Sequence, residues 1–535
     1  MTKKIDKSGN APVLAWCALA IIVFGVIIAI RIRLLGIPLE RDEGEYAYAG
    51  QLMLQGIPPY KLAYSMKFPG TCAAYALIMS IFGQTILGIH LGLLLTNAGT
   101  TVLIFFVGRR LTNATAGIAA AMSYGVLSVS PFVYGLAAHA THFVVVSVLG
   151  GTLLLLDESG PQRLGRLFAS GLIFGLSLLM KQPAVFFVVF AAIYLLCNDV
   201  QRRFTLKGIL LRSLIFSAGV ILPFGIALLL LWRAGVFGKF WFWAIDYARQ
   251  YGTLVPISNA PEIFLHRVKE VIGAGWAIWM LAGIGAVVGL VDKSIRASMV
   301  FLLGLLLFST LALCPGFYFR PHYFIMILPA VSLFVGIAIS RLSDLTGRMI
   351  LVRFVPLVML GTTLTLPILW EKKFFFEVSP VDACRKTYSD NPFAESVKIA
   401  DYLREHTSRD DTIAVLGSEP EIYFYAQRHS ATAYIYTYGL MEPQKYARQM
   451  QEEMIHEIER ARPKYLVWVV TFYSWLWRPA SDRLIFTWAD EYTAQNYEAA
   501  GLVSMTSTKT DYFFGDVPSS VESLENRILI YRRNP

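Results

Sequence analysis

Long apolar runs alternate with short charged segments over the first 370 residues of the chain. A helix needs about 20 predominantly apolar residues to cross a bilayer, and runs of this kind predict transmembrane helices. About eleven runs qualify, at residues 12–30, 86–107, 114–135, 140–156, 167–180, 183–197, 208–232, 271–291, 297–314, 322–339 and 349–370. The pattern therefore predicts a polytopic α-helical membrane protein.

Basic residues gather in every second connection between these runs, as Arg109 and Arg110 do after the second run. Since cytoplasmic loops collect Lys and Arg, we place these connections in the cytoplasm, together with the N-terminal segment that carries Lys3, Lys4 and Lys7. An odd number of crossings then places the C-terminus outside. The stretch 167–197 has basic residues on both flanks, so it must cross twice and turn at Lys181-Gln182-Pro183.

The pattern changes near residue 371, where long apolar runs stop and acidic residues become common. We expect a membrane domain over 1–370 and a small extracytoplasmic α/β domain over 371–535. The second domain contains no glycine-rich phosphate loop. Its periodicity predicts helices at Phe393–His406 and Gln444–Arg462, and strands at Thr412–Leu416, Tyr465–Val470 and Arg527–Tyr531.

Composition agrees with the membrane prediction and removes other classes of protein. Of the 535 residues, 56% are hydrophobic and only 16% are charged, against about 25% charged in a soluble domain. A net charge of +10 would indicate nucleic-acid binding in a soluble protein. Here it follows from basic cytoplasmic loops, so we expect no nucleic-acid partner. The five cysteines show no pairing at short spacing, which excludes the usual zinc and redox motifs.

The first outer connection, about residues 31–85, carries the densest group of candidate functional side chains. Its acidic segment Arg41-Asp42-Glu43-Gly44-Glu45 stands directly before Tyr46 and Tyr48, and Lys67 follows. Tyrosines can stack on sugars or donate hydrogen bonds. A solvated acidic loop is the alternative. An acidic spot with separated cations suits a substrate that carries a leaving phosphate.

Other outer segments extend this picture. Arg320 and His322 stand at another outer helix end. Arg31 either reaches the lipid headgroups or binds an anionic ligand. The half-apolar stretch Thr71–Phe82 is short for a span, so we expect it along the membrane surface. In the second long outer connection, about 233–270, the aromatic residues predict an interfacial belt, with a sugar platform as the alternative; they are Trp241, Trp243 and Tyr247.

Several of these motifs resemble bacterial GT-C glycosyltransferases, in particular the branch similar to protein O-mannosyltransferases and the lipid A aminoarabinose transferase. The resemblance covers most of residues 12–340, and the acidic segment is its most specific part. It rests on Arg41–Tyr48, Gly56–Tyr60, Lys67–Gly70, Gly108–Leu111 and Pro321–Phe324.

The resemblance implies transfer of a sugar from a polyprenyl phosphate to a hydroxyl on the outer side of the cytoplasmic membrane. A phosphate is already a good leaving group, so what helps is a base for the acceptor and cations for the phosphate. The resemblance places the base at Asp42, with Glu43 orienting the acceptor or assisting. It places the donor-phosphate contact at Lys67, with Arg320 and His322 as further candidates. Single attack would invert the anomeric centre.

The chain departs from this family in two places. An Arg usually follows the acid by three residues in the aminoarabinose branch, whereas this chain has Glu45 there, so the phosphate contact would come from Arg41 or Arg31. A second outer acid is replaced by His139 and His142. These histidines would hydrogen-bond the acceptor or phosphate, cap the turn, or bind a divalent metal with the acid.

The remaining assignments stay open between alternatives. Lys181 either reaches the headgroups or contacts the lipid phosphate. Glu45, Tyr46 and Tyr48 would bind the acceptor or the sugar. We expect no resident cofactor. A transporter or lipid flippase is the main competing function, and a non-catalytic scaffold is a third. A transporter would place its ionisable groups near the bilayer midplane, whereas here they lie at the outer helix ends. The acceptor is left open between a glycan, a lipid and a protein.

Overall fold

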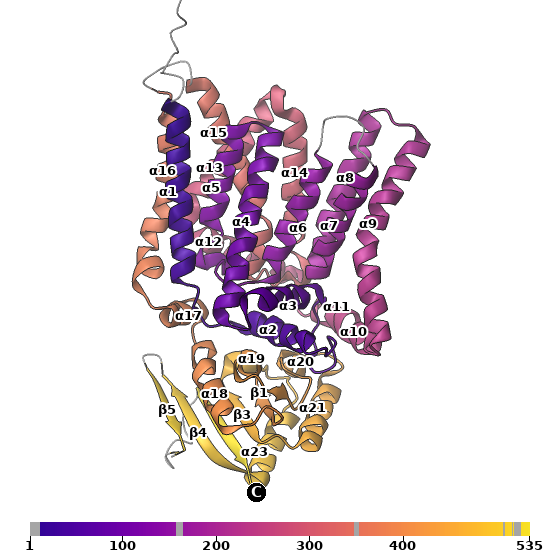
Figure 1. Cartoon of the computed structure of the whole chain (residues 1–535), viewed down its shortest axis with the longest axis vertical. Coiled ribbons are helices and arrows are strands. Elements are labelled where there is room, and N and C mark those ends of the chain that lie inside the picture. The colour runs from indigo at the N-terminus through magenta and orange to yellow at the C-terminus, as the bar shows by residue number, and fades with distance from the viewer. Residues whose placement is uncertain (1–10, 157–163, 347–351, 507–508, 516, 518–525) are drawn as a thin grey trace, which may run out of the picture. The chain divides into compact units, whose positions relative to one another are not determined.

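The computed structural model describes residues 11–156, 164–346, 352–506, 509–515, 517 and 526–535 (Figure 1). These residues form two compact units, each assembled from separate stretches of the chain. The helical unit comprises Met1–Leu35, His90–Ile226 and Val255–Val378, and the sheet unit comprises Gly36–Ile89, Ala227–Leu254 and Ser379–Pro535. The predicted boundary at residue 371 follows composition alone, so it stays a prediction beside this contact-based division. Lys3, Lys4 and Lys7 lie outside the described residues.

Each of the eleven predicted apolar runs overlaps a helix, and one further helix, at Ala260–Ile272, precedes the helix of the run 271–291. Residues 349–351 of the last run lie outside the described residues. The helices are α1 (Ala11–Arg33), α4 (Ile86–Leu111), α5 (Ala114–Leu127), α6 (Ala140–Leu155), α7 (Leu164–Met180), α8 (Val185–Gln201), α9 (Leu206–Arg233), α12 (Ala260–Ile272), α13 (Trp276–Val291), α14 (Arg296–Leu311), α15 (Leu328–Thr346) and α16 (Val355–Trp370). The predicted break at Lys181 is confirmed, because it separates α7 from a 3-10 turn that leads into α8.

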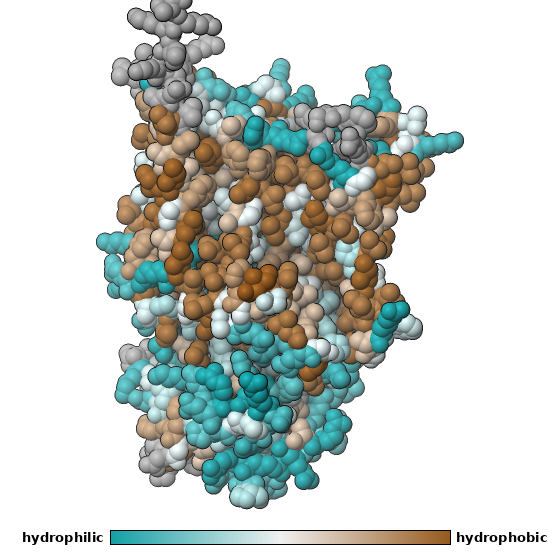
Figure 2. Space-filling view, in the orientation of Figure 1, coloured by the Kyte–Doolittle hydropathy of each residue, from teal (hydrophilic) through white to brown (hydrophobic). Residues whose placement is uncertain are grey.

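Seven helical stretches in the described chain are long and apolar enough to cross a membrane. The other four predicted spans, α5, α6, α7 and α16, are helices of 14, 16, 17 and 16 residues. The outward surface of the helices is largely apolar, as the brown area in Figure 2 shows; Ile21 of α1 is 72% exposed and Leu230 of α9 is 61% exposed. Such side chains are stable in lipid and costly in water. The chain is therefore a multi-pass membrane protein, and the number and direction of its crossings stay predictions.

Small residues let the central helices approach closely. A Cβ added to Gly336 of α15 would lie 2.4 Å from the carbonyl oxygen of Ala116 in α5. A Cβ on Gly285 of α13 would lie 1.9 Å from the carbonyl oxygen of Phe334 in α15. Close backbone packing of this kind is the main source of helix association in lipid, where no hydrophobic effect acts between helices.

A six-stranded sheet forms the centre of the sheet unit, in the order β2-β1-β3-β6-β4-β5. β1 runs parallel to β2 and β3, and the remaining pairs are antiparallel, with Val415 opposite Val467 and Val467 opposite Ile530. The strands are β1 (Thr412–Leu416), β2 (His429–Ser430), β3 (Tyr465–Val470), β4 (Tyr497–Met505), β5 (Thr510–Phe514) and β6 (Arg527–Arg533). β1 and β3 match the prediction, and β6 continues two residues beyond it.

Helices flank this sheet within the same unit (Figure 1). The predicted helices appear as α18 and α21, whereas the sequence pattern gave no expectation for β2, β4, β5 or most of the short helices. The helices that follow the helical unit's last span are α17 (Pro380–Tyr388), α18 (Phe393–His406), α19 (Glu421–Ala426), α20 (Tyr438–Met441), α21 (Ala447–Ala461), α22 (Phe472–Trp475) and α23 (Leu484–Asn496).

Residues 31–85, predicted as an outer loop, contain two regular helices of the sheet unit. These are α2 (Arg41–Leu54) and α3 (Gly70–Phe82). The acidic segment is thus the first turn of a helix and not a solvated loop; the loop prediction was wrong because α2 is stabilised by tertiary burial, with Tyr46 only 2% exposed. The predicted position of Thr71–Phe82 at the membrane surface remains a prediction.

The second outer connection also joins the sheet unit. It forms α10 (Phe237–Trp241), a π-helix (Phe242–Tyr247) and α11 (Ala248–Tyr251). Trp243 and Tyr247 are each 5% exposed and belong to the hydrophobic core that includes Leu416 and Leu466. The predicted aromatic belt is therefore wrong for these two residues, because their rings pack inside the unit. Trp241 is 47% exposed.

Candidate functional site

The acidic segment begins α2 through a capping box. The carboxylate of Glu40 accepts a hydrogen bond from the backbone N–H of Glu43 at 2.9 Å, and Glu43 Oε2 accepts one from the N–H of Glu40 at 3.3 Å. This reciprocal pair satisfies two backbone donors that a helix start leaves open. Glu43, predicted to assist catalysis, is 1% exposed and serves this cap. Asp42 is the more accessible acid, with a side chain 17% exposed.

Asp42 and Glu45 share one face of α2 because they stand three residues apart on a helix. Lys67 lies between their carboxylates: its Nζ is 2.7 Å from Asp42 Oδ1 and 2.6 Å from Glu45 Oε2. We call these three side chains the acid–lysine cluster. Glu45, expected to bind the acceptor or the sugar, thus binds the cluster's own cation, a pairing that sequence spacing does not reveal.

The loop before α3 holds Lys67 in place. The hydroxyl of Tyr60 donates to the carbonyl oxygen of Lys67 at 2.6 Å, and Ser65 Oγ accepts from its backbone N–H at 3.1 Å. Tyr64, in the same loop, donates its N–H to the carbonyl of Ala433 at 2.7 Å and stacks on Trp243 with 5.3 Å between ring centroids. The lysine therefore sits on a loop fixed at several points.

Two tyrosine rings flank the lysine. Its Nζ lies 4.6 Å from the ring centroid of Tyr46 and 5.6 Å from that of Tyr436. Tyr436 lies between β2 and α20, so the C-terminal part of the chain contributes directly to the cluster. Burial opposes the charge of Lys67, but the carboxylates of Asp42 and Glu45 outweigh it and raise its pKa well above the ordinary value. Burial raises the pKa of Glu45, and Lys67 offsets part of this effect.

Arg41, predicted to bind the donor phosphate, is buried against the C-terminal part of the sheet unit. Its guanidinium donates to the carbonyl oxygen of Ser418 at 2.6 Å, to that of Tyr473 at 3.1 Å, and to Glu419 Oε1 at 3.1 Å. The ring of Tyr438 lies 4.9 Å from its Cζ. Oxygen atoms of the protein thus accept the hydrogen bonds of the guanidinium. These contacts favour a positioning role for Arg41 over a phosphate-binding one.

The three residues that bind the Arg41 guanidinium lie at the carboxyl ends of two neighbouring strands of the sheet. Ser418 and Glu419 follow the carboxyl end of β1, and Tyr473 follows that of β3. The neighbours β2 and β3 lie on opposite sides of β1. In α/β sheets, ligands bind outside the strand ends at such a switch point. Here the position is filled by the chain's own Arg41, so the C-terminal part fixes the start of the helix that carries Asp42.

Gly44 allows α2 to approach α19 at backbone distance. A Cβ at this position would lie 2.6 Å from the backbone nitrogen of Glu421. Glu421 is fully buried, and its Oε1 accepts a hydrogen bond from the Ser396 hydroxyl at 2.7 Å. Burial, followed by the neighbouring Glu419, raises the pKa of Glu421 to about 8. The glycine in the acidic segment is therefore required by packing.

Tyr48 has a structural role in the described chain. Its ring is fully buried and lies 5.2 Å from that of Tyr423, and its hydroxyl accepts from the N–H of Ser430 at 2.8 Å. A sugar cannot reach a ring without exposed surface. We therefore leave Tyr48 out of the candidate sugar-binding residues. The same argument applies to Tyr46, which is 2% exposed; its ring contacts the Lys67 ammonium instead.

The helical unit brings several other predicted residues together. The imidazoles of His139 and His322 stack with 4.0 Å between centroids. Tyr323 lies beside His322 at 4.7 Å, and the Lys181 ammonium lies 4.0 Å from the Tyr323 ring centroid. His142 lies in the first turn of α6, where its backbone N–H donates to the carbonyl oxygen of His139 at 3.0 Å. Lys181 therefore contacts an aromatic ring next to the histidine pair.

The remaining cations of the helical unit have different surroundings. Arg320 lies with its Cζ 5.3 Å from the ring centroid of Tyr318. Arg31 donates to the carbonyl oxygens of Ser128 at 2.9 Å and Gly135 at 3.3 Å, and it is 4% exposed. Burial and these two contacts oppose the headgroup alternative for Arg31 and tie α1 to the segment after α5, while anion binding by this side chain stays a prediction.

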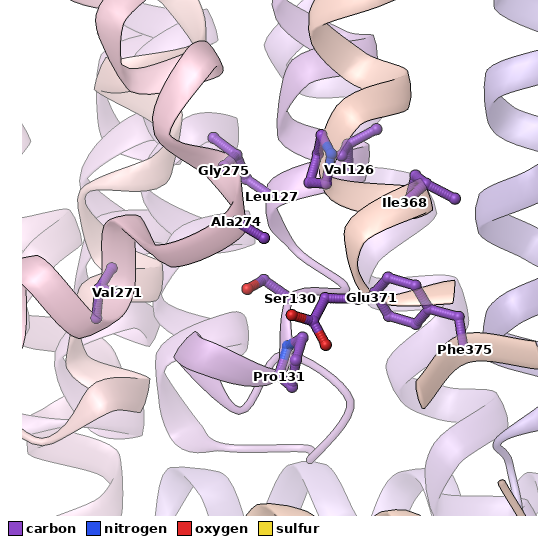
Figure 3. A pocket seen from close by; sticks show the side chains of 11 residues that line it. Val126, Leu127, Ser130, Pro131, Val271, Ala274, Gly275, Ile368, Glu371 and Phe375 are labelled. Carbon is purple, nitrogen blue, oxygen red and sulfur yellow. The ribbon is translucent and has the colours of Figure 1, made fainter. Parts of the chain in front are cut away.

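A pocket in the helical unit involves none of the predicted site residues (Figure 3). Its lining is mainly apolar and comes from α5, α12, α16 and the turns beside them, with Ser130 and Glu371 as its polar side chains. The lining residues are Val126, Leu127, Ser130, Pro131, Val271, Ala274, Gly275, Pro367, Ile368, Glu371 and Phe375. This pocket gives no support to a second reaction centre.

Sequence and fold comparisons agree on one class of protein. Residues 67–227 match the family model described as dolichyl-phosphate-mannose-protein mannosyltransferase. No curated protein matches the sequence. Together with the fold described next, the family match confirms the predicted resemblance; the match begins at Lys67, after the acidic segment.

Solved structures show the same fold at low sequence identity. ArnT from Cupriavidus metallidurans, bound to undecaprenyl phosphate, is 14% identical with a TM-score of 0.57, and the match covers 98% of each chain. The oligosaccharyltransferase of Archaeoglobus fulgidus, in complex with Zn and sulfate, is 14% identical with a TM-score of 0.54, over 94% of this chain and 74% of that one. The archaeal oligosaccharyltransferase AglB from Archaeoglobus fulgidus, in complex with an inhibitory peptide and a dolichol-phosphate, is 11% identical with a TM-score of 0.51. This match covers 94% of this chain and 75% of that one.

The chain thus has a fold found in membrane glycosyltransferases of the GT-C class, and its residues 67–227 match a family model of such enzymes. Within that class its fold is that of ArnT along nearly the whole length of both chains, C-terminal mixed sheet included.

Proposed function

We propose that this protein transfers a sugar from a polyprenyl-phosphate donor to a hydroxyl group on the outer face of the cytoplasmic membrane. The observation that carries the proposal is the acid–lysine cluster, which holds a partly exposed carboxylate and a cation 2.7 Å apart. Solved relatives are described with undecaprenyl phosphate or dolichol-phosphate bound, which supports a lipid phosphate as the donor's carrier.

The reaction needs a base and a cation, and the cluster supplies both. In our proposal the Asp42 carboxylate takes the proton of the acceptor hydroxyl while that oxygen attacks the anomeric carbon. The bond from this carbon to the phosphate oxygen breaks, and the lipid phosphate leaves with the bonding electron pair. Lys67 stabilises the developing charge on that phosphate. Attack from the face opposite the phosphate inverts the anomeric centre.

The geometry of the cluster also links donor binding to activation of the base. A lysine ammonium has three hydrogens, and the ion pairs with Asp42 and Glu45 use two of them. The third can serve a phosphate oxygen. As the phosphate draws the ammonium toward itself, the Asp42 carboxylate is released to act as a base, while Glu45 keeps the lysine at the site.

Residues of the helical unit complete the proposal. Lys181, Arg320 and His322 would contact the donor phosphate, and His139 and His142 would hydrogen-bond the acceptor or the phosphate. Lys181 is the best supported of the cations, because its ammonium already lies against Tyr323 beside the histidine pair. A divalent metal bound by the histidines and Asp42 remains the alternative use of these imidazoles.

Replacing Asp42 with Asn tests the proposal directly. Purified Asp42→Asn protein in lipid nanodiscs should transfer sugar from an undecaprenyl-phosphate donor at least 100-fold more slowly than wild type, because it lacks a proton acceptor. Asp382→Asn is a matched control, since Asp382 is an exposed acid in the first turn of another helix of the sheet unit. Equal rates for Asp42→Asn and wild type would refute the base assignment.

Two further measurements separate the proposal from its rivals. Determining the anomeric configuration of the product tests the single attack, and retention would contradict it. A transporter or flippase would move its substrate across a vesicle membrane in the Asp42→Asn variant as fast as in wild type, without forming a new glycosidic bond.

A further inference from the structure

One short segment of the sheet unit carries an unusual share of exposed aromatic surface. From Ser379 onward, the large hydrophobic side chains that are exposed in the described chain are Val381, Phe472, Tyr473 and Trp477. Three of these four are aromatic and fall within six consecutive residues. The surface of this part of the protein is otherwise largely polar, as the teal area in Figure 2 shows. Contiguous exposed apolar surface that is rimmed by polar residues is typical of interaction or ligand-binding sites.

Local structure presents these rings to the outside. The segment follows β3 and forms a single helical turn, α22, which ends at Leu476 with a left-handed backbone (φ 52). The indole N–H of Trp475 donates to the carbonyl of Val469 at 2.9 Å and anchors the turn. A non-glycine residue with positive φ is uncommon and is kept only where surrounding contacts hold it. The exposed rings therefore sit on a fixed support.

A continuous series of contacts joins these rings to the acid–lysine cluster. Phe472 lies 5.8 Å from Trp477 and 5.6 Å from Tyr473, measured between ring centroids. The hydroxyl of Tyr438 donates to the carbonyl of Tyr473 at 2.7 Å, and the Tyr438 ring lies 4.9 Å from that of Tyr436. Tyr436 in turn lies 5.6 Å from the Lys67 ammonium. We call this series, Trp477 to Tyr436, the aromatic track.

We propose that the aromatic track binds sugar rings of the acceptor, so that the acceptor is a glycan or a glycan-bearing lipid; this inference rests on the proposed function. The C–H face of a pyranose packs on an aromatic ring, while tyrosine hydroxyls and nearby polar groups meet its hydroxyls. A track that starts at exposed rings and ends beside the proposed base aligns such a chain with the reacting centre.

The surroundings of the track favour a glycan over a lipid surface. Trp477 carries the Arg483 guanidinium at 5.0 Å from its ring centroid, and its exposed chain neighbours are Arg478, Pro479 and Ala480. A membrane-inserted patch would add long aliphatic side chains to its aromatic ones. Trp241 is the contrasting case: it is 47% exposed in the same unit and has no part in the contacts of the track.

Ligand contact can be measured by saturation-transfer NMR on the full-length protein in nanodiscs. The probes are the methyl glycosides of mannose, glucose and N-acetylglucosamine. We expect saturation transfer to ring C–H protons of at least one probe, reduced at least threefold in Phe472→Ala and in Trp477→Ala. Trp477→Phe should retain most of the signal because it keeps a flat ring, and Trp241→Ala should match wild type. Signals that are unchanged in both alanine variants, or absent with every probe, overturn the proposal.

A second experiment tests whether the aromatic track contacts membrane lipid instead of a glycan. In nanodiscs that contain brominated phosphatidylcholine, the fluorescence lost on going from wild type to Trp477→Phe reports whether Trp477 was quenched by lipid. Strong quenching of that component would place the track in the bilayer and refute the glycan assignment. Weak quenching supports it. Equal thermal unfolding of the variants and wild type confirms that the substitutions act locally.

The outcome for the track is distinguishable from that for the reaction. Asp42→Asn should lose sugar transfer and keep probe binding. If wild type itself transfers no sugar from an undecaprenyl-phosphate donor, yet probe binding depends on Phe472 and Trp477, the proposed function fails while the carbohydrate site stands. If wild type transfers sugar but probe binding is unchanged in Phe472→Ala and Trp477→Ala, the proposed function stands while the carbohydrate site fails.

Discussion

Replacing Lys67 with Met is the sharpest test of the acid–lysine cluster. The change removes the cation that the structure places 2.7 Å from Asp42 and 2.6 Å from Glu45, while keeping a side chain of similar length between the rings of Tyr46 and Tyr436. Methionine packs well in irregular space. The variant therefore isolates the charge from the shape of the residue.

Two magnitudes follow from the geometry. Breaking a buried ion pair by removing one partner costs about 3–5 kcal/mol. The Lys67 and Asp42 side chains are 16% and 17% exposed, so water relieves part of this cost. We therefore expect the loss of unfolding free energy to lie at the lower end of this range. Losing one positioned donor at a developing negative charge lowers kcat by about 10²- to 10³-fold. Binding of undecaprenyl phosphate should weaken as well.

The assay compares three proteins reconstituted in nanodiscs. Wild type, Lys67→Met and Lys239→Met are measured for sugar transfer from an undecaprenyl-phosphate donor, for undecaprenyl-phosphate binding and for thermal unfolding. Lys239 provides the matched control because it also pairs with a glutamate, Glu453, and lies over a tyrosine ring, yet its side chain is 45% exposed. Transfer by Lys67→Met within threefold of wild type would refute the role of this cation.

Three other predictions test the framework around the cluster. In a double-mutant cycle on Arg41 and Glu419, the two substitutions should show a coupling of about 2 kcal/mol in unfolding free energy, and a value near zero would contradict the buried pair. Gly44→Ala should lower both the unfolding temperature and kcat because its Cβ would lie 2.6 Å from a backbone nitrogen, whereas Gly25→Ala, which meets nothing within 4 Å, should be neutral. Glu421 has a folded-state pKa of about 8, above its ordinary 4.5, so its protonated form is favoured in the folded state. Its contribution to stability is therefore complete below about pH 4.5 and falls as the pH rises to 8; thermal unfolding should follow this slope in wild type and lose it in Glu421→Gln.

The capping box and the sheet show why part of the site could not be found in the sequence. Glu43 and Asp42 are adjacent acids, and their chain positions do not tell which one closes a helix cap and which one faces a lysine. Glu419 follows a strand that was correctly predicted, but its partner Arg41 lies 378 positions earlier in the chain. Pairing over such separations depends on how the sheet unit gathers its three segments.

Periodicity and charge alone predicted the membrane class, the break at Lys181, three strands and two helices of the C-terminal part, and the family resemblance pointed to Asp42 and Lys67 as candidates. These features depend on neighbouring residues, because apolar runs partition into lipid and strand or helix periods repeat over a few positions. The tertiary structure decided the rest. The acidic segment lies in a buried helix, Arg41 lies at the switch point of the sheet, and Tyr436 lies beside Lys67. Burial and long-range packing decide which polar groups meet, so these features could not be found from neighbouring residues.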